Sequence, residues 1–381
     1  GSVTFVPYLT TSVIDPIALG YACDGEVWPV HNVTQNKYYN NIQPAIDALS
    51  TVTGDVITVA AGTYTEDVAV NKTLTLQGAS GATVNPFTAG GSVFTVTASS
   101  VNISGFTVSG ATGGGQAGIY LGAGVASCNI SNNTLTGNYD GIWLGSGSTF
   151  NTFTKNTLTG NYQGFELYHA DYNTFGSSNP LDANNASSNS QYGFKLESAD
   201  HNTFTKNSAS SNGKYGFYLA AGSSNSDNNT LTGNTANLNT EYGIRINSST
   251  DNALTGNTFD LNVVAGIRLK DDIANLTLDQ NKFTNSALGI DIASGAGSVT
   301  SWTVIHNDLS GNATYGLTNG GTGTLTATCN WWGSADYNLV WPEVSGSVTF
   351  VPYLVTNDLV TPVCTGAVPP VHNVTQNKYY N

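Results

Sequence analysis

One short phrase centred on a glycine recurs nine times between residues 116 and 319 of this 381-residue chain. Five of the eight spacings between these glycines are 23 residues, and the other three are 27 or 29. A fixed period in this range is the signature of a solenoid, in which each repeat stacks on the previous one. The unbroken repeat therefore predicts one elongated domain, where length alone would suggest two or three. The glycines are Gly118, Gly141, Gly164, Gly193, Gly216, Gly243, Gly266, Gly289 and Gly316.

Residues alternate in character after each of these glycines. The first and third positions are apolar, as in Ile142 and Leu144, whereas the position between them is mixed. Such alternation is typical of a strand with one buried face. A second strand precedes it in each repeat, as in NTLTGN, and no helical period separates the two, so we expect an all-β coil. The outward residues are then Tyr120, Trp143, Glu166, Lys195, Tyr218, Arg245, Arg268 and Asp291.

Asparagine recurs eight or nine residues before these glycines. Stacked coils lie about 4.8 Å apart, so equivalent asparagines are expected to form a ladder in which each side-chain amide bonds to the next. The repeated glycine itself suits a position that needs a positive φ or a close approach of two backbones. The asparagines are Asn133, Asn156, Asn184, Asn207, Asn234, Asn257, Asn281 and Asn307.

The stretches that are most specific to a family lie outside the regular repeats. The first spans residues 41–79 and reads NIQPAIDAL and then GDVITVAAGTYTEDVAVNKTLTLQGA; the second, at residues 329–338, reads CNWWGSADYN and is followed by GSVTFVPYL. Together with the repeats, they make the chain resemble the right-handed parallel β-helix repeat proteins of the pectin-lyase-like superfamily, above all the NosD-like surface and periplasmic group. The resemblance implies a single-stranded right-handed parallel β-helix with coils of about 23 residues. Such repeats indicate a fold and not an activity.

Two segments of the chain each occur twice. Residues 1–9 and 346–354 both read GSVTFVPYL, and residues 29–40 and 370–381 both read PVHNVTQNKYYN. The simplest interpretation is slightly more than one unit of a tandem array. The alternative is a single-copy chain whose ends were duplicated by accident.

The tandem interpretation predicts three parts. We expect the exit strand and linker of a preceding unit at 1–35, a solenoid at 36–345, and an exit strand and linker to the next unit at 346–381. The linkers contain proline and would act as semi-rigid spacers. The exit strand is expected to pair with the edge of a neighbouring unit. Its residues are Val3, Phe5, Pro7 and Tyr8 in one copy, and Val348, Phe350, Pro352 and Tyr353 in the other.

Both ends of a solenoid need caps, because an open end exposes core side chains and unpaired strand edges. Residues 41–50 place four apolar side chains at helical spacing, which predicts a short N-terminal capping helix. They are Ile42, Ala45, Ile46 and Leu49. Three tryptophans are predicted to plug the other end of the core, and an exposed sugar-binding platform is the alternative. They are Trp331, Trp332 and Trp341.

The four cysteines have different predicted roles. Cys329, near the C-terminal end of the solenoid, and Cys364, in the linker, are expected to form a disulfide that staples the linker to the solenoid. Cys23 is the linker equivalent of Cys364 and would pair with a preceding unit. Cys128 is expected to be a buried thiol. The alternative is that all four are reduced.

Composition excludes several classes of function. The chain has a formal charge of −14 and only 11 lysines and arginines, which argues against nucleic acid as a partner. It has no run of 18 apolar residues, so no membrane span is predicted. Its richness in threonine, asparagine and glycine suits an extracellular or cell-surface protein. No cofactor is predicted.

Two related turns could bring acid–base residues together. LYHADYNTF and LESADHNTF place His169, Asp171, Asp200 and His201 near one turn of adjacent coils. Clustered carboxylates can act on acidic polysaccharides, but the alternative is a turn in which Asp and Asn bond their own backbone. The Asp/His signatures of polygalacturonase-like relatives and the DPHE-type motif of alginate epimerases are absent. The resemblance therefore supplies no catalytic residue, and no enzyme is predicted.

Metal binding has little support. The five histidines lack ligand spacing, and the chain contains no methionine. The NosD-like group includes a periplasmic protein linked to copper delivery, but soft or imidazole ligands for copper are not clustered in this sequence. No metal site is predicted.

Tyrosines and sequons remain as surface features. Tyrosines before four of the glycines are expected to stack on one another or, alternatively, on sugars; they are Tyr192, Tyr215, Tyr242 and Tyr315. Asn-X-Ser/Thr sequons are candidate glycosylation sites if the protein is secreted by an organism with the machinery. The candidates are Asn32, Asn71, Asn185, Asn228, Asn247 and Asn373.

These observations favour a structural repeat module of an extracellular filament, sheath or surface array that assembles end to end with copies of itself. The alternatives are a polysaccharide-binding or adhesin module and a carbohydrate-active enzyme of the lyase or epimerase kind.

Overall fold

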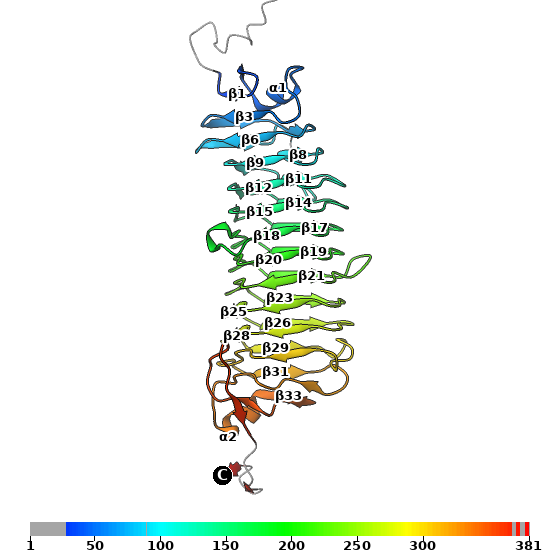
Figure 1. Cartoon of the computed structure of the whole chain (residues 1–381), viewed down its shortest axis with the longest axis vertical. Coiled ribbons are helices and arrows are strands. Elements are labelled where there is room, and N and C mark those ends of the chain that lie inside the picture. The colour runs from blue at the N-terminus through cyan, green and yellow to red at the C-terminus, as the bar shows by residue number, and fades with distance from the viewer. Residues whose placement is uncertain (1–27, 89, 368–370, 374–377, 381) are drawn as a thin grey trace, which may run out of the picture.

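The computed structural model describes residues 28–88, 90–367, 371–373 and 378–380. They form one long rod of stacked coils that runs from the N-terminal end of the chain to the C-terminal end (Figure 1). Three parallel sheets run along the rod. The predicted all-β parallel solenoid is therefore confirmed. The predicted residues Val3, Phe5, Pro7, Tyr8 and Cys23 lie outside the described residues.

The first sheet has 13 strands, and the two strands at its N-terminal end form a hairpin. In spatial order they are β2 (Lys37–Tyr39), β1 (Val30–Asn32), β3 (Val56–Val59), β6 (Thr75–Gly78), β9 (Asn102–Ser104), β12 (Asn129–Ser131), β15 (Thr152–Thr154), β18 (Thr174–Gly176), β20 (Thr203–Thr205), β22 (Thr230–Thr232), β24 (Ala253–Thr255), β27 (Thr277–Asp279) and β30 (Thr303–Ile305).

The second sheet has 12 strands and contains the repeated glycines. Its strands are β5 (Val68–Val70), β8 (Phe94–Val96), β11 (Ala117–Leu121), β14 (Asp140–Leu144), β17 (Gln163–Tyr168), β19 (Tyr192–Glu197), β21 (Tyr215–Ala220), β23 (Tyr242–Asn247), β26 (Ala265–Lys270), β29 (Leu288–Ile292), β31 (Tyr315–Asn319) and β33 (Val344–Gly346).

The third sheet is shorter and is continued by isolated bridges. It contains β4 (Gly62–Thr65), β7 (Ala82–Asn85), β10 (Thr107–Ser109), β13 (Thr134–Thr136), β16 (Thr157–Leu158), and further along β25 (Thr258–Asp260) with β28 (Lys282–Thr284). Other pairs are β32 (Leu325–Thr326) with β34 (Val348–Thr349), β35 (Tyr353–Leu354) with β36 (Cys364–Gly366), and β37 (Val371–Asn373) with β38 (Lys378–Tyr380). The helices are α1 (Ile42–Asp47), η2 (Pro180–Asp182), α2 (Tyr337–Val340) and η3 (Trp341–Glu343).

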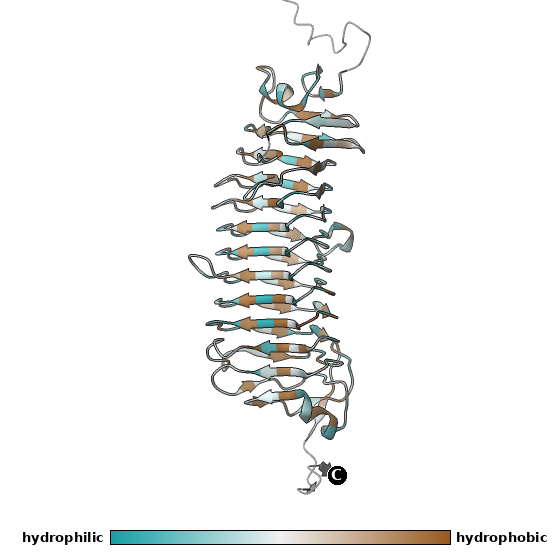
Figure 2. Cartoon of the chain, turned by 180° about the vertical axis from the view of Figure 1, so that it is seen from behind, coloured by the Kyte–Doolittle hydropathy of each residue, from teal (hydrophilic) through white to brown (hydrophobic). Residues whose placement is uncertain are grey.

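Equivalent residues of successive repeats stack directly on one another. Ile119 pairs with Ile142, and Ile142 with Phe165, all with inward side chains. Hydrophobic bands consequently line up from strand to strand along the rod (Figure 2). In the middle of the core, Phe194 stacks between Phe165 and Phe217 at centroid distances of 4.8 and 4.9 Å. The buried columns predicted from the alternation are therefore present.

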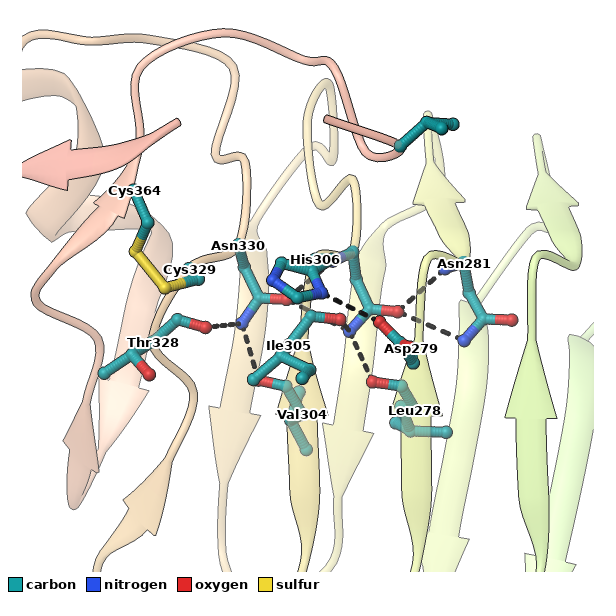
Figure 3. Close-up of polar contacts among 12 residues, drawn as sticks. Leu278, Asp279, Asn281, Val304, Ile305, His306, Thr328, Cys329, Asn330 and Cys364 are labelled. Carbon is teal, nitrogen blue, oxygen red and sulfur yellow. Dashed lines mark hydrogen bonds and ion pairs between the residues drawn. A yellow bond between two sulfur atoms is a disulfide. The ribbon is translucent and has the colours of Figure 1, made fainter. Parts of the chain in front are cut away.

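The predicted asparagine ladder runs through the buried turn after the first sheet. Each Oδ1 accepts from the backbone N–H and the Nδ2 of the asparagine one coil earlier, as Asn330 does from Asn307 at 2.8 and 3.0 Å. Each Nδ2 also donates to a carbonyl oxygen of an earlier coil (Figure 3). Two further ladders pass through Asn151 and Asn161, five residues to either side of Asn156. The five-residue spacing in NTFTKNTLTGN was the sequence signal for them.

The repeated glycines are required by close approach of backbones and not by a positive φ. None of them is among the described residues with φ above zero. A Cβ on Gly216 would lie 2.7 Å from the carbonyl oxygens of Ala209 and Gly243 and 2.5 Å from the Cβ of Ala236. The sequence left two explanations for the repeated glycine, a positive φ or a close approach of two backbones, and the structure supports the close approach.

The N-terminal end is closed by the β1–β2 hairpin and α1. Ile42, Ala45 and Ile46 are buried as predicted, but Leu49 is fully exposed. The helix ends at Asp47 because Ala48 adopts an extended ψ of 135°, which removes Leu49 from the helical face. The capping helix is thus confirmed, and its predicted length was too great.

The C-terminal end is closed by the segment that we predicted to be an exit strand. Val348 pairs within the chain, through β34, to Leu325 of β32, so the last coil extends past residue 345. Phe350 packs against Trp332 and Tyr337, and Tyr353 is buried. This copy of GSVTFVPYL, which was expected to pair with the edge of a neighbouring unit, thus pairs within the chain, and its aromatic side chains belong to the chain's own cap.

The three tryptophans near this end differ in burial. Trp332 is 2% exposed and plugs the core, whereas Trp341 is 36% exposed. Trp331 is half-buried. Of the three, Trp332 thus fills the predicted role of a plug.

Candidate functional site

The outer face of the second sheet carries the most varied side chains of the repeat. The position two residues after each repeated glycine pairs in register on consecutive strands, from Tyr120 with Trp143 to Arg268 with Asp291. We call these eight side chains the outer stripe. They are the predicted Tyr120, Trp143, Glu166, Lys195, Tyr218, Arg245, Arg268 and Asp291.

Four of the five charges of the outer stripe lie beside opposite charges, whereas Arg245 pairs in register with Arg268 and donates to the Tyr215 hydroxyl at 2.7 Å. Lys195 Nζ lies 2.7 Å from Glu166 Oε1 and 2.9 Å from Glu197 Oε2. Burial opposes the charge on Lys195, but the two carboxylates outweigh it and raise the lysine pKa. Arg268 forms an ion pair with Asp291. These two ion pairs are favourable cross-strand contacts between adjacent coils.

Asp140 is a buried acid next to the outer stripe. It is 0% exposed, its Oδ1 accepts from Gln163 Nε2 at 3.0 Å, and its Oδ2 has no partner. Gln163 Nε2 also donates to Glu166 Oε2 at 3.3 Å. Burial, and then the negative charge of Glu166, raise the pKa of Asp140 to about 8. Asp140 therefore holds a proton at neutral pH.

Sequence reasoning missed Asp140 and Gln163. They occupy the position before the repeated glycine, where four other repeats have tyrosine. The sequence signal that could have found them was the absence of tyrosine at this position. That absence did not indicate that Asp140 is buried, because its burial depends on side chains of the neighbouring coils.

Replacing Asp140 with asparagine is expected to remove a pH dependence of stability. The folded chain binds a proton here between the ordinary Asp pKa of 3.8 and about 8, so the stability of the parent chain falls as pH rises through that range. The asparagine side chain would keep the bond from Gln163 without a charge. At pH 9 we expect the Asp140→Asn variant to be more stable by at least about 1.4 kcal/mol, the value of one pKa unit. Urea denaturation at pH 5 and pH 9 measures this, and an equal loss of stability with pH in both proteins would contradict it.

An aromatic pair lies at the N-terminal end of the outer stripe. The rings of Tyr120 and Trp143 are 4.5 Å apart and both side chains are half-buried. Trp143 Nε1 has no hydrogen-bond partner. With Glu166 and Lys195 on the next two strands, this group could stack on a sugar ring and bond its hydroxyls. Asp140 itself is closed to solvent, so it cannot exchange a proton with an exposed substrate.

The predicted His/Asp turn is structural. Asp171 Oδ1 accepts from the backbone N–H of Asp200 at 2.8 Å, and Asp200 Oδ1 accepts from that of Asp227 at 2.7 Å. His201 stacks on Tyr172 at a centroid distance of 4.6 Å. His169 Nε2 lies 3.0 Å from the Ser223 hydroxyl, two coils away. Asn173 and Asn202 donate to backbone carbonyls of their own turns at 3.0 and 3.1 Å, as the turn interpretation expects. The Asp carboxylates instead order the backbone of the next coil.

The predicted tyrosine column stacks on itself. Tyr215 lies 5.2 Å from both Tyr192 and Tyr242, measured between ring centroids. Tyr315 is separated from this stack by Ala265 and Leu288. Mutual stacking, the plainer of the two interpretations, describes the first three residues.

A pocket of about 700 Å³ lies beside the N-terminal hairpin. His31 and Tyr38 line it and stack on each other at a centroid distance of 3.9 Å. Trp28 and Gln77 also line it, but its lining contains no carboxylate. The pocket therefore offers stacking and hydrogen bonding without acid–base chemistry.

Cys329 and Cys364 form a disulfide, with an S–S distance of 2.01 Å and Cα atoms 5.1 Å apart (Figure 3). The bond joins the last coil to the linker, where we expected it. Cys128 is free and buried, and burial raises the pKa of its thiol.

The glycosylation candidates differ in access. Asn71, Asn185 and Asn228 are exposed, and Asn247 is half-buried. Asn373 lies in β37. Asn32 is 0% exposed, and its Nδ2 donates to Thr51 and Asp55 at 3.0 and 2.9 Å. The structure contradicts the prediction of a glycan at Asn32, because the nitrogen that would carry it is buried and bonded.

Within the part of the chain that the structure describes, no three His, Cys, Asp or Glu side chains gather in a way that could hold a metal ion. The same part contains no helix that is long and apolar enough to cross a membrane.

Comparison with protein families gives two matches that together span most of the rod. Residues 49–226 match the family described as periplasmic copper-binding protein (NosD), and residues 176–331 match the right-handed β-helix region. The chain is a right-handed parallel β-helix repeat protein. Copper binding is the description of that family; this β-helix protein contains no methionine.

A cell surface glycoprotein of Methanothermus fervidus is 41% identical to this β-helix protein over 106 residues. The match covers 28% of this chain and only 17% of that protein. This match and the periplasmic family support an extracellular or surface location, so the chain is a surface-associated β-helix protein.

Solved structures share the fold at low identity. The A-module of the mannuronan C-5 epimerase AlgE4 of Azotobacter vinelandii has a TM-score of 0.59 and 17% identity, covering 83% of this chain and 94% of that one. The AlgE6 A-module has a TM-score of 0.56 and 14% identity, covering 87% and 95%. A tailspike protein of bacteriophage CBA120 has a TM-score of 0.52 and 13% identity, covering 67% and 43%. At these identities the likeness concerns the fold alone.

Proposed function

We propose that this β-helix protein is a structural repeat module of an extracellular filament, sheath or surface array, in which solenoids join end to end. The observation that carries the proposal is where the duplicated sequences lie. PVHNVTQNKYYN forms the hairpin that closes one end of the solenoid, and GSVTFVPYL completes the other end. Duplicated segments thus form both ends of one complete rod. The relative that is a cell surface glycoprotein supports the same role.

The chemistry of the outer stripe supports a role without catalysis. Glu166 and Asp291 are in ion pairs, and Asp140 is closed to solvent. The His/Asp turn uses its carboxylates to bond backbone. We therefore propose a mechanical mechanism, in which stacked strands make a stiff rod and the junctions transmit load between rods.

Electron microscopy of the native cell envelope tests this proposal. The 12 strands of the second sheet, at about 4.8 Å each, give a rod of roughly 60 Å per unit. We expect continuous fibres or sheets with an axial repeat somewhat longer than this. Discrete particles no longer than one rod would overturn the proposal.

Polysaccharide binding is a second candidate, favoured by the Tyr120–Trp143 pair beside Glu166 and Lys195. If sugar rings stack there, replacing Trp143 with alanine is expected to weaken binding about tenfold, which is the upper range for one aromatic contact. Trp341, which is 36% exposed at the C-terminal end, supplies the control as Trp341→Ala. Titration with a polyuronate and with a neutral glucan measures both variants. Absence of binding to either polymer would exclude this second function.

A further inference from the structure

The repeated hairpin occurs twice in the structure, in two different settings. As β1–β2 it caps its own solenoid, with β1 antiparallel to β3 and β2 as the last strand of the sheet. As β37–β38 it forms the same antiparallel pair, with Val371 opposite Tyr380 as Val30 is opposite Tyr39. Identical sequence thus forms the same antiparallel strand pair at both places.

The second copy lies near the C-terminal cap at the end of the rod. Its strand β38, the equivalent of β2, lies against α2. In the first copy, β2 is the strand that faces away from its own solenoid. One hairpin therefore has an inner strand for its own first coil and an outer strand for the cap of another rod.

The disulfide limits how far the second copy can move from that cap. Only residues 365–370 separate Cys364 from Val371, so the two residues can be at most about 25 Å apart. Without the bond, only the two-stranded pair of β35 with β36 would hold Cys364 to the rod, and such a pair is marginal in water. Once this pair opens, the tether begins at Leu354 and contains residues 355–370, with a reach of about 60 Å.

From these observations we infer that the hairpin is a joint in which β2 of one solenoid docks on α2 of the solenoid before it, held there by the Cys329–Cys364 bond. The inference rests on the proposed end-to-end array and names its contact surfaces. Successive rods would abut directly, and no long spacer would separate them. Leu339 of α2 is still 61% accessible with β38 beside it, and a complete following solenoid would cover more of this side chain.

Hydrogen–deuterium exchange on the full 381-residue chain tests the joint. A lone two-stranded hairpin is marginally stable at best in water, so protection of the β37–β38 amides requires docking. We expect these amides to be protected, and Leu339→Asp to make them exchange about tenfold faster. The matched control is Leu238→Asp, at a side chain that is 56% exposed on the flank of the rod. It should leave the hairpin unchanged.

Cys364→Ser provides a second variant that does not touch α2. Lengthening the tether from six to sixteen residues should lower the effective concentration of the hairpin roughly fourfold. Exchange in β37–β38 should rise accordingly, with the solenoid amides unaffected. Unprotected hairpin amides in the parent chain, or no response to either variant, would overturn the joint.

The outcomes separate the joint from the array. Continuous fibres in the envelope together with an unprotected hairpin would leave the array standing and remove the joint. A protected hairpin that responds to Leu339→Asp, with only discrete particles in the envelope, would leave the docking contact and remove the array.

Discussion

Replacing Asn184 with alanine is expected to lower the free energy of unfolding by about 4 kcal/mol, because several buried groups lose partners worth about 1–3 kcal/mol each. Asn184 is 0% exposed in the middle of the ladder. Its Oδ1 accepts from the N–H and the Nδ2 of Asn156 at 3.1 and 3.0 Å. Its Nδ2 donates to Phe153 O and Asn207 Oδ1 at 2.8 and 2.9 Å. Alanine can replace none of these bonds.

The adjacent Asn185 is a matched control for this substitution. Its side chain is exposed, and its backbone takes part in the third sheet through N–H and carbonyl groups that alanine retains. Asn185→Ala should change stability by less than about 0.5 kcal/mol. Urea denaturation of both variants, produced without glycosylation, provides the measurement. Similar midpoints for the two variants would show that the ladder contributes little.

Replacing Gly216 with alanine is expected to destabilise the chain by about 3 kcal/mol, at the upper range for overpacking. The added Cβ would meet two carbonyl oxygens at 2.7 Å and the Cβ of Ala236 at 2.5 Å. The neighbours are backbone and a methyl group fixed to it, so relief requires adjacent coils to separate. Because those coils are hydrogen-bonded to each other, separating them would also strain the backbone hydrogen bonds between β21 and β23.

Gly256 distinguishes crowding from conformation. It has a φ of +66°, and a Cβ there would meet nothing within 4 Å. Gly256→Ala should therefore cost only the left-handed conformation, about 1 kcal/mol. Thermal unfolding of the Gly216→Ala and Gly256→Ala variants measures the loss of stability in each. A larger loss at Gly256 than at Gly216 would mean that φ, and not close packing, explains why glycine recurs.

The stacked interior could be predicted because a short period converts local pattern into long-range contact. When coils have nearly equal length, each residue meets its equivalent one coil away, as Ile142 meets Ile119 and Phe165. The alternation of apolar and mixed residues predicts which side chains point inward, and the spacing of the asparagines predicts where the asparagine ladder runs. The three longer spacings did not disturb the register, because their extra residues leave the coil between strands, as in η2.

The unusual part of the outer stripe could not be predicted. Asp140 and Gln163 break the tyrosine column, and their chemistry depends on Glu166 and Lys195 in adjacent coils. Whether an acid at such a place is exposed or buried depends on side-chain packing across the face. A one-dimensional pattern carries no measure of that packing.

The ends of the rod also depended on tertiary structure. Asn32 is in a good sequon, yet the hairpin folds over the first coil and buries it against Thr51 and Asp55. GSVTFVPYL was expected to pair with a neighbouring unit, yet Tyr353 packs into the chain's own cap and donates to Ala335 O at 3.1 Å. Both segments lie outside the regular repeat, where no equivalent neighbour indicates what they contact.

By itself, the sequence determined the solenoid, its inward columns, its asparagine ladder and the pair of cysteines that meet at its end. These follow from periodicity, because a repeated coil has one way to stack like residues on like. Tertiary structure alone decided how the two ends close, which sequons are buried, and where Asp140 keeps its proton. Those properties come from contacts between segments that share no pattern, and their burial and electrostatics exist only once the coils are stacked.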